Sequence, residues 1–183
     1  MARLHHRIFA LVGALLFLGS TVAITAGILW QMHQDNQTKQ QTSQTNQGAT
    51  LEGSTLQNFT PINKIDQLQV VDLQQGTGEV VKVGATVTAH YTGAIASTGI
   101  IFQSSHDGQN QPIPFKLIKV KDSPDGRGVI DGWVDGVAGM KVGGTRRLLI
   151  PASLAYGDQS PAPNIPANSD LVFDIELVAV QNP

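Results

Sequence analysis

Residues 130–137 read Ile-Asp-Gly-Trp-Val-Asp-Gly-Val, and this stretch carries the one clear helical pattern in a region that otherwise favours strands. Its apolar side chains recur with the spacing i, i+3, i+4 and i+7, which places them on one face of a helix. They are Ile130, Trp133, Val134 and Val137. Asp131 is a candidate N-cap, and Gly143-Gly144 suits a left-handed C-terminal cap. We therefore predict one short, half-buried helix that begins near Asp131 and ends by Gly143.

Segments rich in Val, Ile and Leu, separated by glycines, flank this helix and predict strands. Thr86–Thr92 alternates strictly, so Tyr91 should face the same side as Val87 and Ala89. The last segment places Phe173 inward for the same reason. The strand candidates are Leu68–Leu73, Thr86–Thr92, Ile100–Ser104, Phe115–Val120, Thr145–Ile150 and Leu171–Val180. Four to six antiparallel strands and one short helix predict an α+β domain in which the sheet wraps the helix.

The N-terminus predicts a membrane segment. Residues 8–30 contain no charged residue and follow Arg3 and Arg7, and they exceed the roughly 20 residues that a helix needs to cross a bilayer. Basic residues stay on the cytoplasmic side, so the rest of the chain should lie outside the cytoplasm. A cleaved signal peptide is the alternative, although its apolar region normally runs about 7–15 residues. Both interpretations predict export: a domain anchored at the cell surface or in the periplasm, or a secreted domain if the signal is cleaved.

A different composition follows. Residues 31–60 begin with a run of Gln, Thr, Asn and Ser that cannot bury enough apolar surface to fold, which predicts a disordered linker. The sequence thus predicts three parts: a signal anchor over 1–30, a linker over 31–60 and a folded domain over 61–183.

Charge and composition exclude several functions. The net charge is −2 and 14% of residues are charged, so nucleic acid is not an expected partner. There is no cysteine, which excludes disulfides, thiol catalysis and zinc–thiolate sites. His106-Asp107 has no second ligand at metal spacing, and Ser104 and Ser105 have no evident His/Asp pair. We expect no metal and no cofactor, and nothing in the sequence points to an oligomer.

Seven short motifs occur in one order between Leu68 and Val180. They are His90-Tyr91-Thr92-Gly93, Phe102 before Ser104-Ser105, Pro114-Phe115-Lys116, Val129-Ile130-Asp131-Gly132-Trp133, Leu154-Ala155-Tyr156-Gly157, Ile165-Pro166 and Leu171-Val172-Phe173-Asp174. Together they resemble the FKBP-type peptidyl-prolyl cis/trans isomerases, the macrolide-binding immunophilins. The resemblance implies that family's antiparallel half-barrel around a short helix.

The resemblance also implies a proline pocket made from every aromatic residue after Pro61. Residues at catalytic positions of the family are Tyr91, Phe102, Trp133, Tyr156 and Phe173; residues at substrate-binding positions are Phe115, Val129, Ile130, Ile165 and Gln103. Trp133 would form the floor, and the N–H of Ile130 and the hydroxyl of Tyr156 would donate to substrate carbonyls. From strand and helix faces alone, Tyr91, Trp133 and Phe173 fit an ordinary core better than a pocket. The resemblance reverses that preference.

Three features depart from the family pattern. Gln103 occupies the position of an acid that normally bonds within the pocket, and Asn164 replaces an apolar wall residue. The segment 119–128 is longer than in minimal members and should form a loop near the pocket entrance. The predicted function is an isomerase that assists the folding of proline-containing exported proteins, with macrolides as further ligands. The alternative, favoured by Gln103, is a peptide-binding chaperone or scaffold module with little turnover.

Overall fold

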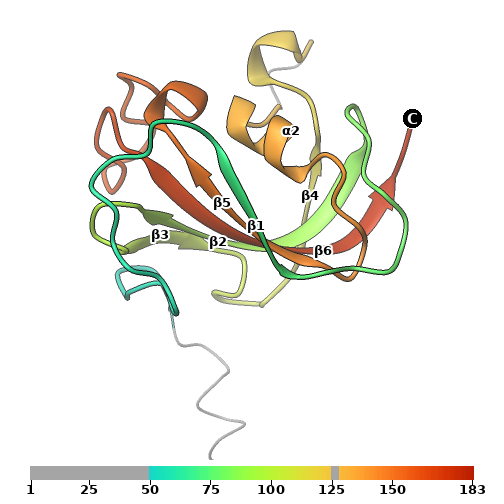
Figure 1. The fold of residues 1–183 in the computed structure, drawn as a ribbon, viewed down its shortest axis with the longest axis horizontal. Coiled ribbons are helices and arrows are strands. Elements are labelled where there is room, and N and C mark those ends of the chain that lie inside the picture. Colours follow the sequence, from blue (N-terminus) through green and yellow to red (C-terminus); the bar gives the residue numbers. More distant parts are fainter. Residues whose placement is uncertain (1–49, 125–127) are drawn as a thin grey trace, which may run out of the picture. The chain divides into compact units, whose positions relative to one another are not determined.

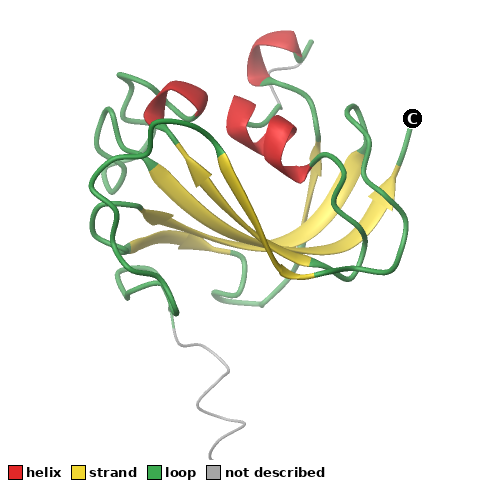
Figure 2. Ribbon diagram, in the orientation of Figure 1, coloured by secondary structure: helices red, strands yellow, loops and turns green. Residues whose placement is uncertain are grey.

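One antiparallel sheet curves around a short helix in the computed structural model of this chain (Figure 1), with strands and helices distinguished by colour in Figure 2. The structure describes residues 50–124 and 128–183. The strands are β1 (Gln69–Gln74), β2 (Thr86–Ile95), β3 (Ile101–Ser104), β4 (Ile113–Lys116), β5 (Thr145–Ile150) and β6 (Leu171–Gln181). The helices are α2 (Asp131–Val137) and the 3-10 turns η1 (Val120–Asp122) and η2 (Ala152–Leu154).

The strand order is β1-β5-β6-β2-β3, and β4 pairs with β2 beyond the end of β3. The two longest strands, β2 and β6, pair along their whole length at the centre of the sheet, with a bulge between Thr88 and Ala89. This confirms the predicted antiparallel sheet with one short helix. The fourth strand lies earlier than the predicted Phe115–Val120. β4 ends at Lys116, which pairs with Thr86, the first residue of β2. Val120 already belongs to η1.

Helix α2 differs from the prediction at both ends. Ile130 is the N-cap residue, with an extended backbone and no side-chain cap, so Asp131 lies in the first turn instead. An acidic side chain there still interacts favourably with the helix dipole. The helix ends at Val137, well before Gly143, because the backbone leaves the helical conformation at Ala138 and is left-handed at Gly139, with φ 78°. Arg146 satisfies carbonyls at this end: its Nη1 donates to those of Gly136 at 2.8 Å and Ala138 at 3.4 Å.

Two glycines allow α2 to lie close against β5. A Cβ atom on Gly132 would collide with Ile150, and one on Gly136 would lie 2.6 Å from Cδ2 of Leu148. On this face, the backbone of α2 therefore packs directly against side chains of β5. Trp133 and the valines of the predicted stripe are buried against the concave face of the sheet, where the main core lies.

A second, smaller core covers the other face of the sheet. It combines residues of the strands with residues that precede them: Leu56, Ile65, Ala94, Ala96, Ile101, Leu149 and Val172, with Leu51, Phe59 and Ile62 packed against them. Thr92, on the face of β2 opposite Tyr91, is buried as well. Figure 1 shows this N-terminal part of the described chain on the face of the sheet opposite α2.

The predicted linker therefore ends earlier than residue 60. Residues 51–59, which we call the N-terminal strap, are folded onto the sheet, with Leu56 only 6% exposed. The physical reason is local: the sheet has apolar residues on both faces, and the second face needs a cover. Residues 31–49 of that linker and the apolar segment 8–30 lie outside the described residues. Within residues 50–124 and 128–183, no helix is long and apolar enough to cross a membrane.

Candidate active site

All six aromatic side chains of the predicted set line one cavity of about 240 Å³. They come from β2, β3, β4, α2, β6 and the segment after η2: Tyr91, Phe102, Phe115, Trp133, Phe173 and Tyr156. Gln103, Val129 and Ile130 line it too, as the resemblance implied. Ile165 does not line it; this residue is buried in the main core. Three further residues line it: Ile113, which the sequence did not indicate, and Val120 and Gly128, which belong to the segment predicted near the entrance.

Five of the six rings form one connected cluster around Trp133. The indole meets Phe115, Phe173 and Tyr91 nearly perpendicular, with ring centroids 4.9, 5.3 and 5.4 Å apart. Phe102 extends the cluster by meeting Phe173 at 5.7 Å and 85°. Edge-to-face contacts of this kind stabilise aromatic pairs beyond simple burial. Each ring is therefore held by its neighbours, which preorganises the walls of the cavity.

Gly93 explains how two of these rings approach β2. A Cβ atom at this position would lie 2.6 Å from Cζ of Phe102 and 2.7 Å from Cε1 of Phe173. Both rings thus lie over the bare backbone of the strand. The glycine is required by close approach, because no side chain fits between the strand and the two rings.

The floor of the cavity is apolar. Trp133 is 6% exposed, and its indole nitrogen is buried without a hydrogen-bond partner in the part of the chain that the structure describes. The cavity therefore meets the hydrocarbon part of the indole rather than its N–H.

The polar groups of the site are hydrogen-bond donors. Burial raises the pKa of Tyr156, and burial together with the nearby Tyr156 raises the pKa of Tyr91, so both hydroxyls remain protonated at neutral pH. Ile130 caps α2: its carbonyl accepts from the N–H groups of Trp133 and Val134. The N–H of such a residue has no partner within the helix, which leaves it available to a ligand.

A Ser–His contact that the sequence did not indicate lies beside the cavity. The Oγ of Ser105 is 3.1 Å from Nδ1 of His90, and the His90 ring stacks on His106 with centroids 4.5 Å apart. Ser105 is only 6% exposed, its Oγ accepts from the N–H of Tyr91 at 2.9 Å, and it does not line the cavity. It therefore serves to hold β2 and β3 together. No group of three metal-ligating side chains occurs among residues 50–124 and 128–183.

The three departures from the family pattern have different positions. Gln103 is exposed at the cavity edge. Asn164 does not line the cavity: its Nδ2 donates to the carbonyl of Phe102 at 3.0 Å and to Glu52 Oε1 at 2.7 Å. The longer segment contributes Val120 and Gly128 to the lining, as its predicted place near the entrance requires.

A curved sheet and one short helix thus enclose a ring-lined cavity whose size and apolar walls suit a compact apolar group. Comparison with known proteins gives the family. Residues 77–178 match the model of the FKBP-type peptidyl-prolyl cis-trans isomerases, and the chain belongs to that family. The matched family model is described as one of isomerases, and two of the relatives below carry the same description.

Several relatives are named as peptidyl-prolyl cis-trans isomerases or FK506-binding proteins. A peptidyl-prolyl cis-trans isomerase of Saccharomyces cerevisiae is 48% identical over 99 residues, covering 54% of this chain and 67% of the relative. An FK506-binding protein of Streptomyces anulatus is 44% identical over 115 residues, covering 62% and 86%. Another S. cerevisiae isomerase is 46% identical over 114 residues and covers 62% of this chain, but the chain spans only 25% of that relative's length.

Solved structures agree with the fold. The crystal structure of FkpA from Escherichia coli superposes with a TM-score of 0.53 at 34% identity, covering 69% of this chain and 53% of FkpA. A peptidyl-prolyl cis-trans isomerase from Pseudomonas syringae gives 0.52 at 32% identity, covering 66% and 80%.

Proposed function

We propose that this protein catalyses cis/trans isomerisation of X–Pro bonds in exported polypeptides, and that the ring-lined cavity is its active site. One observation carries the proposal: all six aromatic rings after Pro61 line a single cavity of about 240 Å³. That cavity suits a proline ring flanked by backbone. The proposed catalytic residues are Tyr91, Phe102, Trp133, Tyr156 and Phe173, and the proposed binding residues are Phe115, Val129, Ile130 and Gln103.

The mechanism requires no covalent step. Amide resonance imposes a barrier of about 18–20 kcal/mol on rotation, and the planar amide is the more charge-separated state. Twisting the bond breaks the resonance and lowers the dipole. An apolar cavity therefore disfavours the planar ground state more than the twisted transition state, which is catalysis by differential stabilisation. The hydroxyl of Tyr156 and the N–H of Ile130 would hold the flanking carbonyls while the bond rotates.

The place of action is part of the proposal. Residues 8–30 would anchor the chain with its isomerase domain outside the cytoplasm, at the cell surface or in the periplasm, or would be removed as a signal and release the domain. The substrates would then be proline-containing proteins that fold after export. We further propose that the protein acts as a monomer and that macrolides compete for the cavity.

A second function is favoured by Gln103. A neutral amide at the cavity edge in place of an acid would leave peptide binding intact while reducing turnover. The protein would then hold proline peptides as a chaperone or scaffold.

A proline-isomerisation assay on the full-length chain in lipid discs tests both functions. We expect acceleration above the uncatalysed rate, and its loss in Trp133→Leu, which removes the floor. Leu73→Ala, an exposed side chain on β1, is the matched control and should keep wild-type activity. Binding of a proline tetrapeptide without acceleration would support the scaffold function instead. Neither acceleration nor binding would exclude both.

A further inference from the structure

The N-terminal strap pairs with the free edge of β3, the strand that carries Phe102. Gly53 N–H donates to the carbonyl of Ile101, and Ile101 N–H donates to the carbonyl of Ser54, both at 2.8 Å. Leu56 N–H donates to Gly99 at the same distance. At its first residue, Ile101, β3 is thus paired on both sides, with β2 on one side and the strap on the other.

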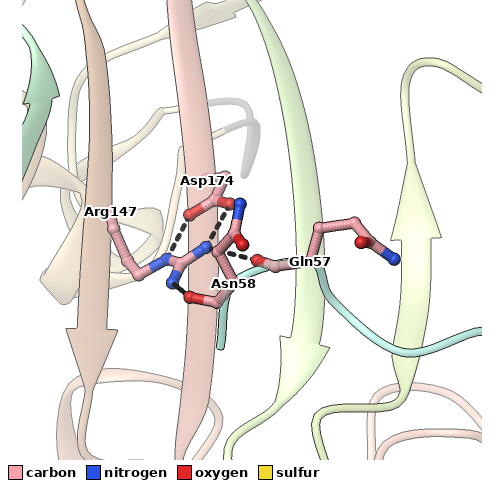
Figure 3. A network of polar contacts seen from close by, with 4 residues as sticks. All are labelled: Gln57, Asn58, Arg147 and Asp174. Carbon is pink, nitrogen blue, oxygen red and sulfur yellow. Dashed lines mark hydrogen bonds and ion pairs between the residues drawn. The ribbon is translucent and has the colours of Figure 1, made fainter. Parts of the chain in front are cut away.

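Side chains also bind the backbone of the strap near both of its ends. At the strap's start, the carboxylate of Asp107 accepts from the N–H of Leu51 at 2.6 Å and of Glu52 at 3.3 Å. At its far end, Arg147 holds the backbone of the strap (Figure 3). The guanidinium of Arg147 donates to the carbonyls of Asn58 at 2.6 Å and Gln57 at 3.0 Å, while Asp174 binds it on the other side. The ring of Phe59 lies 5.5 Å from the same guanidinium.

Asn164 connects the strap to the wall of the cavity. Its amide nitrogen has two donor hydrogens, and it donates to one acceptor on each side: Glu52 Oε1 in the strap and the carbonyl of Phe102 in β3. Asn164 itself belongs to the loop between η2 and β6, which also carries Tyr156. One amide therefore joins three segments that are distant in the sequence, and two of them contribute rings to the cavity.

We propose that Asn164 is a positioning residue for the proline cavity, tying Phe102 to the N-terminal strap so that the docked strap sets the position of this wall. The inference deepens the proposed function and rests on it. Asn164 does not touch the substrate in this proposal; it acts through the backbone of Phe102. Because Phe102 contacts Phe173, which contacts Trp133, a shift of β3 would reach the floor through the ring cluster.

The test uses the full-length chain in a Trp30→Phe background, so that Trp133 is its one tryptophan. Asn164→Asp keeps the shape of the side chain but removes both donors and adds a charge beside Glu52. We expect KM for a proline tetrapeptide to rise about threefold with a smaller change in kcat, because the ground-state fit of the proline ring is lost. The dissociation constant from Trp133 fluorescence should rise by the same factor.

Three further variants separate positioning from general stability. Glu52→Gln keeps an acceptor oxygen and should resemble the wild type. In the Glu52→Gln, Asn164→Asp double variant, the new amide donates to the new carboxylate, so part of the affinity should return. Asn168→Asp makes the same chemical change in the same loop, at a residue with no side-chain role in the cavity, and should leave KM unchanged.

Several results would overturn the inference. Wild-type KM and peptide affinity in Asn164→Asp would exclude positioning, and equal losses in Asn164→Asp and Asn168→Asp would indicate a general effect on the loop. Glu52→Ala removes the strap's contact at an exposed side chain and stands in if Asn164→Asp fails to fold. A wild-type KM in Glu52→Ala would exclude a role of the strap in positioning Phe102. A wild-type chain that binds peptide without turnover would contradict the proposed function, and peptide affinity in the variants would still decide the inference.

Discussion

A Cβ atom at Gly93 would lie 2.6 Å from Cζ of Phe102, so the ring occupies the space that a side chain on β2 would need. The atoms on both sides are stiff, because the glycine lies in the central strand and the ring belongs to the aromatic cluster. This relationship makes Gly93 part of the cavity although it contributes no side chain to it.

We expect Gly93→Ala to displace Phe102 and Phe173 and to lower kcat/KM about tenfold, with overpacking costing about 1–3 kcal/mol of stability. Isomerase kinetics and thermal unfolding measure the two effects. The double variant Gly93→Ala, Phe102→Leu relieves the collision with Phe102 but not the one with Phe173, so it should recover part of the stability without recovering activity. Recovery of both would mean that the ring of Phe102 has no role in catalysis.

Gln103→Asp should raise kcat. A carboxylate at the edge of the cavity can accept a hydrogen bond from a neighbouring hydroxyl, such as that of Tyr91, and would fix it more firmly than a neutral amide does. Gln103→Asn changes the length without adding charge and serves as the control. An unchanged or lower rate in Gln103→Asp would show that this position does not limit turnover.

Activity should not depend on tyrosine ionisation below about pH 10, the ordinary tyrosine pKa. Burial raises the pKa of both Tyr91 and Tyr156, so the folded protein keeps these protons where an unfolded chain begins to lose them. The stability that depends on the neutral hydroxyls is therefore complete below pH 10 and falls as the pH rises through the folded-state values. Tyrosinate absorbance against pH, with denaturant midpoints at each pH, measures this. If kcat/KM fell at pH 9 in the wild type but not in Tyr156→Phe, ionisation of Tyr156 would already limit activity there, and the prediction would be wrong.

Tyr156→Phe itself should lower kcat/KM about fivefold, the effect of losing one neutral hydrogen bond of about 1 kcal/mol. The ring stays, so the cavity keeps its shape and thermal stability should hardly change. A wild-type rate would exclude the hydroxyl as a donor to the substrate and leave that role to the N–H of Ile130.

The histidine pair predicts a loss of stability in mild acid. Burial lowers the pKa of His90, and repulsion by His106 lowers it further, against an opposing attraction from Glu176. An unfolded chain binds this proton near pH 6.5, whereas the folded chain binds it only at lower pH, so stability falls as the pH decreases from about 6.5. NMR titration of the imidazole protons gives the folded value. In His106→Gln the pKa of His90 should rise; no rise would mean that the stacked ring has no electrostatic effect.

The sequence could predict the sheet, the helix and the set of rings, because each leaves a periodic pattern or a motif. The alternation of β2 placed Tyr91, and the helical spacing placed Trp133. That the rings converge on one cavity could be predicted only from the family resemblance, since their positions on strand and helix faces fitted an ordinary hydrophobic core. Asn164 was placed in the wall by its sequence position, and its real contacts depend on Glu52, more than a hundred residues away in the chain.

The strap was missed for a related reason. Leu56 and Phe59 are isolated apolar residues after a long polar run, and no local period marks them as buried. Their burial depends on an apolar second face of the sheet, formed by residues such as Ala94 and Val172. The end of α2 was missed because the chain already leaves the helix at Ala138 and Gly139, before the predicted cap at Gly143-Gly144.

The ladder between residues 53–56 and 99–101 also has a mechanical consequence. Chain tension applied at residue 50 meets the hydrogen bonds to Asp107 and then these few backbone hydrogen bonds before it reaches the main core. The strand that bears the load is β3, and the first ring it displaces is Phe102. Force applied at this end of the domain would therefore reach the wall of the cavity through β3 before it reaches the central pair β2 and β6.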